Sequence, residues 1–309
     1  MSDRQIQIER AQNLWSSFTR SMEPMARATT MTSDPKQSFD GIGGLTTAKD
    51  EMLTYAYAAT RPETYAKWGT FPPSGVLLIG ASGCGKRMLA TALATQTATS
   101  FVRVDVPKLV VDMVHSNGKA AEFVQKWGQI LEETPQLTLF FDELEFSQAH
   151  DLGGPRPDLP LGPIMDFLLE LIDSAIASGR HLVIGSTAYP DVVRQAFARP
   201  GRLERFVEVT PIFPDDVVTA LEIHSNLAEA RAGHPLFESI DWKHVLKQSE
   251  DTGTGDWVRI LHAVLRRKAR IEAGGDQPDL ISTADLTSET ARFNQARRRI
   301  KLPGGGNYV

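Results

Sequence analysis

The sequence predicts an α/β domain, with a parallel sheet between layers of helices, followed by a small all-helical domain. Short apolar runs alternate with helical stretches up to about residue 212, and near-continuous apolar runs are typical of strands buried on both faces of a parallel sheet. After Pro214 no further strand-like run occurs, and helical spacing continues alone. The glycine-rich segment 80–86 lies between the first apolar run and a helical stretch, as in a strand–loop–helix unit.

The expected strands are short and rich in Val, Ile, Leu and Phe, the composition of buried strands. In chain order they are 76–79, 101–104, 137–141, 182–184 and 206–209. The helices expected between them are 86–97, 118–133, 164–178 and 191–197. Proline and glycine are frequent at 148–163, which predicts a loop. The helices expected in the second domain are 215–231, 242–248, 256–272 and 283–298.

The same patterns divide the chain into four segments. Residues 1–37 are expected to form a leader or amphipathic helix, which would either pack on its own domain or dock a partner. Its apolar side chains at helical spacing are Leu14, Trp15, Phe18, Met22 and Met25. Pro35 and the glycines that follow it mark a boundary. The remaining segments are an α/β domain at 38–212, a helical domain at 213–302 and a flexible tail at 303–309.

Composition argues against several classes of protein. The net charge is −5, so no overall positive field exists to attract nucleic acid, and no nucleic-acid partner is expected. No apolar run approaches the ~20 residues that a membrane helix needs, and residues 1–10 lack the apolar core of a signal peptide. Cys84 is the only cysteine, which excludes an intrachain disulfide and favours a reducing compartment. We therefore expect a cytoplasmic protein without a membrane segment.

A phosphate-binding loop follows the first apolar run. Residues 80–87 read Gly-Ala-Ser-Gly-Cys-Gly-Lys-Arg and match the pattern G-x-x-x-x-G-K-[ST] except at the last position. The glycines let backbone N–H groups converge on an anion, and the following helix adds its positive N-terminal end. This loop makes the predicted sheet one of the P-loop NTPase type. The residues expected to contact the nucleotide phosphates are Gly80, Ala81, Ser82, Gly83, Cys84, Gly85, Lys86, Arg87 and Met88.

A second motif, which is acidic, lies at the end of a later apolar run. The run 137–141 is followed by Asp142 and Glu143. This order fits an aspartate that holds Mg²⁺ and a glutamate that polarises the attacking water. The alternative is that the two carboxylates are ordinary charged residues of a turn. Because one strand–helix unit separates this motif from the phosphate loop, we expect ATP and Mg²⁺ to bind here, with Asp142 as the metal ligand.

Together these motifs resemble those of AAA+ ATPases, on the branch that contains the proteasomal ATPases, the valosin-containing protein, the spastin-like severing enzymes and the FtsH protease. The resemblance extends over about residues 38–300. It implies that Ile42 and Gly43, in the segment Phe-Asp-Gly-Ile-Gly-Gly-Leu, line the adenine. It also implies that His224 contacts the nucleoside and that Gly255 lies in a turn beside the nucleotide. The alternative for His224 is a histidine whose hydrogen bonds are satisfied within its own domain.

The segment Ala-Arg-Pro-Gly-Arg-Leu-Glu-Arg at 198–205 resembles the arginine-finger segment of the family. Arg202 and Arg205 would then reach the γ-phosphate held by a neighbouring subunit, and Asp173 matches an aspartate used in signalling between subunits. An arginine supplied in trans stabilises charge on the transferring phosphoryl group, so catalysis would depend on assembly. The alternative is that both arginines form ordinary ion pairs with nearby glutamates.

The sequence departs from the family pattern at three positions. Arg87 replaces the Ser or Thr whose hydroxyl binds Mg²⁺; a guanidinium has only donors, and would instead contact the β-phosphate. Ala188 replaces an asparagine that orients the attacking water, with Ser186 and Thr187 as the nearby hydroxyls that could substitute. Met113 replaces an aromatic residue that grips a threaded polypeptide. Changing Arg87 to Thr is therefore expected to raise Mg²⁺-dependent hydrolysis.

Two functions of different kinds follow. The first is a ring-forming ATPase, a hexamer by family resemblance, that hydrolyses ATP at subunit interfaces and remodels a protein substrate; its catalytic residues would be Lys86, Asp142, Glu143, Arg202 and Arg205. The second is a nucleotide-binding scaffold with little turnover, in which nucleotide controls assembly. A nucleic-acid machine such as a clamp loader is disfavoured by the acidic balance. The sequence identifies neither the substrate nor an adaptor.

Overall fold

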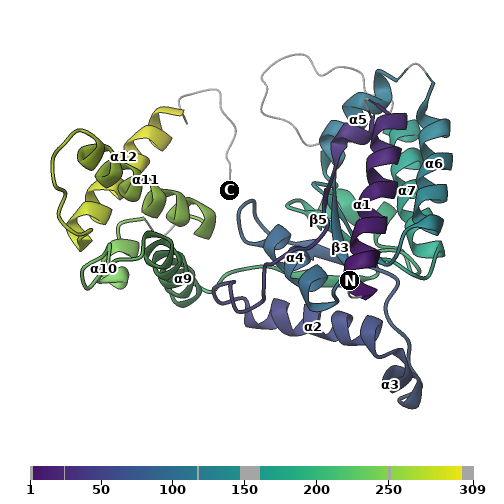
Figure 1. The fold of residues 1–309 in the computed structure, drawn as a ribbon, viewed down its shortest axis with the longest axis horizontal. Helices are drawn as coiled ribbons and strands as arrows, with labels where there is room; N and C mark the ends of the chain where they lie inside the picture. The colour runs from purple at the N-terminus through teal and green to yellow at the C-terminus, as the bar shows by residue number, and fades with distance from the viewer. Residues whose placement is uncertain (1–2, 24, 117, 147–160, 250–251, 301–309) are drawn as a thin grey trace. The chain divides into compact units, whose positions relative to one another are not determined.

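The computed structural model describes residues 3–23, 25–116, 118–146, 161–249 and 252–300 (Figure 1). The expected loop at 148–163 lies almost entirely outside these residues, and the expected tail at 303–309 lies wholly outside them. The chain forms two compact units that are discontinuous in sequence. Unit 1 consists of Met1–Phe39, Thr47–Gly80 and Lys86–Val209, and unit 2 of Asp40–Thr46, Ala81–Gly85 and Thr210–Val309.

Unit 1 contains a six-stranded sheet with the order β1-β3-β4-β5-β2-β6. Its strands are β1 (Thr29–Thr32), β2 (Val76–Ile79), β3 (Ser100–Asp105), β4 (Leu137–Asp142), β5 (Leu182–Thr187) and β6 (Arg205–Glu208). All neighbours pair in parallel except β1 and β3, which are antiparallel. The predicted parallel sheet is confirmed. Every residue of β4 and β5 is buried, which explains their near-continuous apolar sequences.

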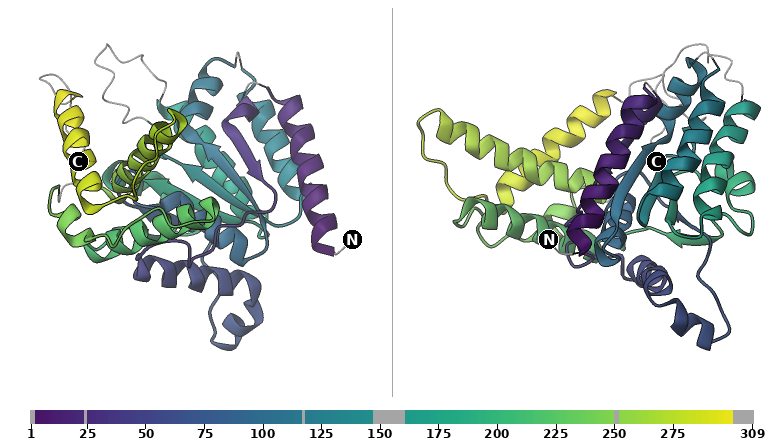
Figure 2. Two further views of the ribbon diagram at one scale, coloured as in Figure 1. Left: turned by 60° about the vertical axis from the view of Figure 1, so that its left-hand side comes forward. Right: turned by 45° about the vertical axis from the view of Figure 1, so that its right-hand side comes forward.

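Strand β1 was missed by the sequence-based prediction, which assigned only a helix to residues 1–37. Its sequence, Thr-Thr-Met-Thr, has no apolar run. It pairs with β3, with Thr29 opposite Val104. The left panel of Figure 2 shows this strand at the edge of the sheet. An edge strand needs less apolar surface than a central one, so composition alone did not reveal it.

Unit 1 also contains helices. They are α1 (Asp3–Ser21), α2 (Thr46–Thr60), α3 (Pro62–Lys67), α4 (Lys86–Gln96), α5 (Val106–Val114), α6 (Ala120–Glu133), α7 (Leu161–Ala177) and α8 (Pro190–Phe197), with a 3-10 turn at Met25–Ala28. Helices α4, α6, α7 and α8 agree with the sequence-based prediction within a few residues. Helices α2, α3 and α5 were not predicted. Asp105 caps α5, where its carboxylate accepts a hydrogen bond from the Lys108 N–H at 3.2 Å.

Helix α1 packs on α6 within the core of unit 1 (Figure 1). Trp15 and Phe18 are buried and meet two aromatic rings of α6. The ring centroids of Trp15 and Trp127 are 5.8 Å apart, and those of Phe18 and Phe123 are 5.6 Å apart. The apolar face of α1 is therefore covered by its own domain, which is the first of the two arrangements considered for residues 1–37.

Unit 2 is built mainly from α9 (Asp215–Ala232), α10 (Trp242–Leu246), α11 (Thr254–Ala273) and α12 (Thr283–Ile300). Trp257 and Leu261 of α11 are buried at the centre of its apolar core. The predicted helical C-terminal region is confirmed. Across the described parts of both units, no helix combines the length and the apolar character that crossing a bilayer requires.

Candidate nucleotide-binding site

The carboxylate of Asp142 lies at the end of β4, where three side chains donate hydrogen bonds to it. Its Oδ2 accepts from Nε and Nη2 of Arg87, at 3.2 and 2.8 Å, and from Nε of Arg103, at 2.8 Å. Its Oδ1 accepts from the Ser186 hydroxyl at 2.8 Å. Strand β4 lies between β3, which carries Arg103, and β5, which carries Ser186. We call Asp142, Arg87, Arg103 and Ser186 the Asp142 cluster.

The Asp142 cluster keeps its carboxylate ionised. The Asp142 side chain is only 8% exposed, and burial alone would raise its pKa. The hydrogen bonds from Arg103, Arg87 and Ser186 outweigh burial and lower the pKa of Asp142 below the usual aspartate value. The cluster is thus a buried carboxylate stabilised by two guanidinium groups and a hydroxyl.

This set of groups does not fit the Mg²⁺ ion expected at Asp142. Magnesium takes an octahedral set of oxygen ligands, whereas both side chains bound to Oδ2 are guanidinium groups without an acceptor. The guanidinium of Arg87 also stands where the metal-binding hydroxyl of the motif would be. Among the residues that the structure describes, no group of three His, Cys, Asp or Glu side chains could hold a metal ion.

Arg103 was not among the predicted site residues. It is the only charged residue in the predicted apolar strand 101–104, and its side chain is 23% exposed. Its Nη2 also lies 3.3 Å from Oδ2 of Asp105. A charged residue within an apolar strand is seldom buried without a partner of opposite charge. The position of Arg103 in such a strand could therefore have identified it as a site residue.

Glu143, the expected water-polarising residue, follows Asp142 in a strained backbone conformation. Its φ angle is +63°, which a non-glycine residue adopts only at an energetic cost. Its N–H donates to the Ser186 hydroxyl oxygen at 3.1 Å. Burial, followed by the charges of Asp142 and Glu145, raises the pKa of Glu143. A carboxylate with a raised pKa is suited to accept a proton.

The hydroxyls near Ala188 are already engaged in local hydrogen bonds. Ser186 donates to Asp142 and accepts from Glu143. The Thr187 Oγ1 accepts from the Tyr189 N–H at 2.9 Å. At Ala188 itself, the backbone N–H donates to Oε1 of Glu145 at 2.9 Å. Ser186 therefore positions the acidic motif, a role that the sequence did not predict for it.

The glycine-rich loop curves through conformations that only glycine adopts easily. Gly83 and Gly85 have φ angles of +78° and +108°. Between them, the Cys84 N–H donates to the carbonyl oxygen of Ala81 at 3.4 Å. Cys84 is buried, in agreement with a structural role for its side chain.

Lys86 is the first residue of α4. Its Nζ donates to the carbonyl oxygen of Gly80, and the Gly80 N–H donates to the carbonyl oxygen of Thr187 at 3.1 Å. Helix α4 thus begins with the cation that the phosphate-binding pattern requires. Of the remaining predicted contacts in this stretch, Ser82 is exposed and Met88 is half-buried.

The expected adenine-lining pair lies in unit 2, in the segment 40–46. Ile42 is buried. Gly43 packs directly on α9, because a Cβ added at Gly43 would lie 2.3 Å from the Cα of Ala220. Only glycine fits at this close approach of two backbones.

Asp216, in the first turn of α9, fixes the adjoining backbone. Its Oδ2 accepts hydrogen bonds from the N–H groups of Leu45, at 3.0 Å, and Ile212, at 2.9 Å. The sequence-based prediction missed Asp216. The available signal for Asp216 was its position as an acidic residue in the first turn of a helix. Its partner Leu45 is far away in sequence, so the sequence did not indicate this hydrogen bond.

Two further predicted contacts belong to unit 2. Gly255, in the first turn of α11, lies against the phosphate loop, since a Cβ there would be 3.0 Å from the Gly83 carbonyl oxygen. The rings of His224 and His262 meet edge to face, with centroids 5.9 Å apart. Burial, followed by neighbouring positive groups, lowers the pKa of both histidines, which favours the neutral imidazole.

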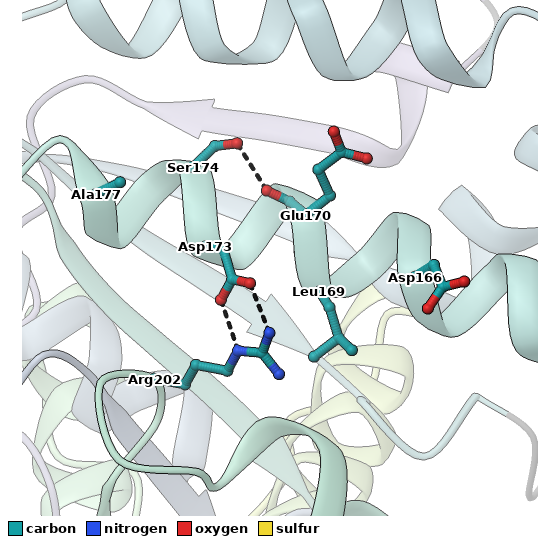
Figure 3. A pocket seen from close by; sticks show the side chains of 7 residues that line it. All are labelled: Asp166, Leu169, Glu170, Asp173, Ser174, Ala177 and Arg202. Atoms are coloured by element: carbon teal, nitrogen blue, oxygen red, sulfur yellow. Dashed lines mark hydrogen bonds and ion pairs between the residues drawn. The ribbon is translucent and has the colours of Figure 1, made fainter.

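Both predicted arginine fingers are held in ion pairs inside unit 1. Nε and Nη2 of Arg202 donate to the two carboxylate oxygens of Asp173, at 2.7 and 2.6 Å (Figure 3). Nη1 of Arg202 donates to the carbonyl oxygen of Ala196 at 2.9 Å. Arg205 pairs with Glu51 of α2, with Nε and Oε2 3.0 Å apart. The flanking residues Glu204 and Glu208 are therefore not the partners; Arg202 pairs with Asp173 of α7, and Arg205 pairs with Glu51.

Met113, which replaces the aromatic residue that grips a threaded polypeptide in the family, lies in α5. Met113 is half-buried and packs against the core of unit 1. Val111 and Val114 are the exposed apolar side chains of this helix. The Met113 side chain is therefore turned partly toward the core of unit 1.

Comparison with known proteins places this chain beside a family of ATPases. Residues 76–211 match the family model described as the ATPase family associated with various cellular activities (AAA). The chain is 31% identical to the proteasome-activating nucleotidase of Archaeoglobus fulgidus over 262 residues, which cover 81% of this chain and 63% of that protein. It is 28% identical to the cell division cycle protein 48 homolog of the same organism over 284 residues, or 92% and 36% of the two chains.

A third relative is the protein CdcH of Halobacterium salinarum, 29% identical over 259 residues that cover 84% of this chain and 33% of the relative. The chain thus spans between 33% and 63% of the length of these curated relatives. The matched residues run from β2 through β6, and so contain Lys86, Asp142 and Glu143. Residues 76–211 thus form a domain of the AAA family of ATPases, and the chain is similar to the proteasome-activating nucleotidases and cell division cycle protein 48 homologues.

Proposed function

We propose that this AAA protein binds ATP or ADP and turns it over slowly, and that the bound nucleotide controls the assembly of copies of the chain into a ring. The Asp142 cluster is the observation that carries this proposal. An ATPase that depends on a metal at Asp142 needs that carboxylate for the metal, whereas here Oδ2 is bound by Arg87 and Arg103. Fixed arginine side chains here supply the positive charge that a metal ion would otherwise supply for catalysis.

Nucleotide binding itself is supported by features of both units. In unit 1, Lys86 begins α4 at the point where the phosphate-binding pattern places its lysine. In unit 2, Gly83 and Gly85 have the positive φ angles of a loop whose N–H groups can converge on an anion. Gly43 packs against α9, and the neighbouring Ile42 is buried. The nucleotide contacts at Ile42, Gly43, His224 and Gly255 remain part of this proposal.

A second candidate is a remodelling ATPase that hydrolyses ATP at subunit interfaces and acts on a protein. Glu143 favours it, because its pKa is raised toward the value of a working base. The names of the relatives, one of which is a proteasome-activating nucleotidase, suggest a protein as the object of such work. In this case Arg202 and Arg205 would complete the site of a neighbouring subunit.

Phosphate release from ATP in the presence of Mg²⁺ separates the two candidates. For the slow scaffold, wild type and Glu143→Gln should both bind ATP and release phosphate near the rate of a buffer blank. For the remodelling ATPase, Glu143→Gln should bind ATP but lose about 100-fold or more of the wild-type rate, since it removes the base. Glu122→Gln, on an exposed face of α6, is the matched control and should behave as wild type. Fast turnover by wild type that Glu143→Gln abolishes contradicts the scaffold.

Assembly is tested by particle mass with and without ATP. Both candidates predict that ATP converts the wild-type protein to a multimer. Arg202→Ala removes a proposed contact to a neighbour's nucleotide, so this variant should keep its affinity for ATP but stay at lower mass. Arg4→Ala, which removes an exposed pair with Asp34, is the control and should assemble normally. Unchanged assembly of Arg202→Ala would exclude a role for Arg202 between subunits.

A further inference from the structure

The acceptor capacity of Asp142 is almost fully used by the chain itself. Three N–H donors, two from Arg87 and one from Arg103, converge on Oδ2, and Oδ1 accepts from Ser186. A carboxylate oxygen has two lone pairs, so Oδ2 has none to offer a metal. Binding of Mg²⁺ at Oδ2 would first require the guanidinium of Arg87, which supplies two of the three donors, to leave.

The two arginines differ in how easily they could leave. Arg103 is 23% exposed and is held at its other end by Asp105, with Nη2 and Oδ2 3.3 Å apart. Arg87 is 57% exposed and lies in the first turn of α4. Displacement of Arg103 would leave a largely buried charge with only its longer pair to Asp105, which is costly. The guanidinium of Arg103 is therefore expected to stay on Asp142 even when Arg87 moves.

The charges of the cluster and its immediate neighbours nearly balance without a metal ion. The positive side chains are Lys86, Arg87 and Arg103, and the negative ones are Asp105, Asp142, Glu143 and Glu145. With Thr at position 87, as the phosphate-binding pattern prefers, the same set would have two net negative charges in place of one. A polyphosphate would then be repelled more strongly unless Mg²⁺ accompanied it. Arg87 weakens that requirement by supplying a fixed positive charge.

Arg87 also has donors that Asp142 does not use. Its hydrogen bonds to Asp142 come from Nε and Nη2, and a guanidinium carries two further N–H groups on Nη1. These donors lie on an exposed group. Arg87 directly follows Lys86, the lysine that contacts the outer phosphates in this motif. Guanidinium groups bind phosphate oxygens through charge-assisted hydrogen bonds.

We infer that this chain binds free ATP and ADP without Mg²⁺, with Arg87, buttressed by Asp142 and Arg103, in the place of the metal. The inference rests on the proposed nucleotide binding and narrows its ligand to the metal-free nucleotide. It assigns Arg87 as a phosphate ligand that determines specificity, and Arg103 as a positioning residue that acts through Asp142.

The test is calorimetric titration of the purified full chain with ATP and with ADP, once in excess EDTA and once in excess Mg²⁺. Wild-type affinity should differ by less than about threefold between the two conditions, or be higher in EDTA. Arg87→Thr should bind about tenfold or more weakly than wild type in EDTA and recover in Mg²⁺, because Thr restores a metal-binding hydroxyl. Arg27→Thr, an exposed arginine paired with Glu23, is the matched control and should follow wild type.

A wild-type affinity that falls about tenfold or more in EDTA would overturn the inference while leaving nucleotide binding intact. Equal affinities of Arg87→Thr in the two conditions would overturn the role of Arg87. No binding of either nucleotide in either condition would overturn the proposed function, and the inference with it. The wild-type comparison decides the main point even if a variant folds poorly.

Discussion

Replacing Asp142 with Ala is expected to lower the free energy of unfolding by about 3 kcal/mol, because it leaves the partly buried guanidinium of Arg103 with only its longer pair to Asp105. Replacing Arg87 with Ala is expected to cost less than about 1 kcal/mol, since the Arg87 side chain is 57% exposed and its ion pair is screened by solvent. Urea unfolding of both variants without nucleotide, followed by circular dichroism, measures the two changes. Equal losses for the two variants would contradict the assignment of Arg103 as the buried partner.

The effect of Asp142→Ala should also depend on pH. The pKa of Asp142 in the folded chain lies below its ordinary value of 3.8, so the folded state favours the ionised form. The stabilisation is therefore fully present above the unfolded-state pKa and is lost as the pH falls through the lower folded-state pKa. The difference in unfolding free energy between wild type and Asp142→Ala should be constant near neutral pH and shrink below about pH 4. A difference that grows with acidity would contradict the ionised state.

Replacing Gly43 with Ala is expected to weaken ATP binding by about tenfold or more and to cost about 2 kcal/mol of unfolding free energy. The added Cβ would lie 2.3 Å from both the backbone nitrogen and the Cα of Ala220. Backbone atoms of a helix cannot move aside as a flexible side chain can, so the segment 40–46 must move away from α9. That movement displaces Ile42, the neighbouring residue proposed to line the adenine.

The control for Gly43→Ala is Gly128→Ala, in α6. No atom lies within 4 Å of a Cβ added at Gly128, and alanine favours a helix more than glycine does. This variant should bind ATP as wild type does and be equally or slightly more stable. Calorimetric titration with ATP and urea unfolding give both quantities. Wild-type affinity in Gly43→Ala would exclude the segment 40–46 from the nucleotide site.

Local sequence signals were sufficient for the main elements of unit 1. The all-apolar run of β2 and the glycines that follow it predicted a strand, a loop and helix α4, because strand burial and positive φ angles each require particular residue types. The fully buried β4 likewise predicted the place of Asp142. The missed elements, β1 and α2, have mixed compositions that become explicable only from the surfaces they cover.

The sequence by itself determined which residues were available for chemistry: the lysine of the phosphate loop, the acidic pair after β4, and an arginine where a hydroxyl was expected. The tertiary structure alone decided how the charges pair. Arg103 and Asp142 are distant in sequence and meet because β3 and β4 are neighbours in the sheet. Arg87 reaches Asp142 from α4, and Arg202 reaches Asp173 of α7 from the loop before β6. Periodicity and residue type are local properties of a chain, whereas the partner of a charge depends on strand order and packing, which no local pattern contains.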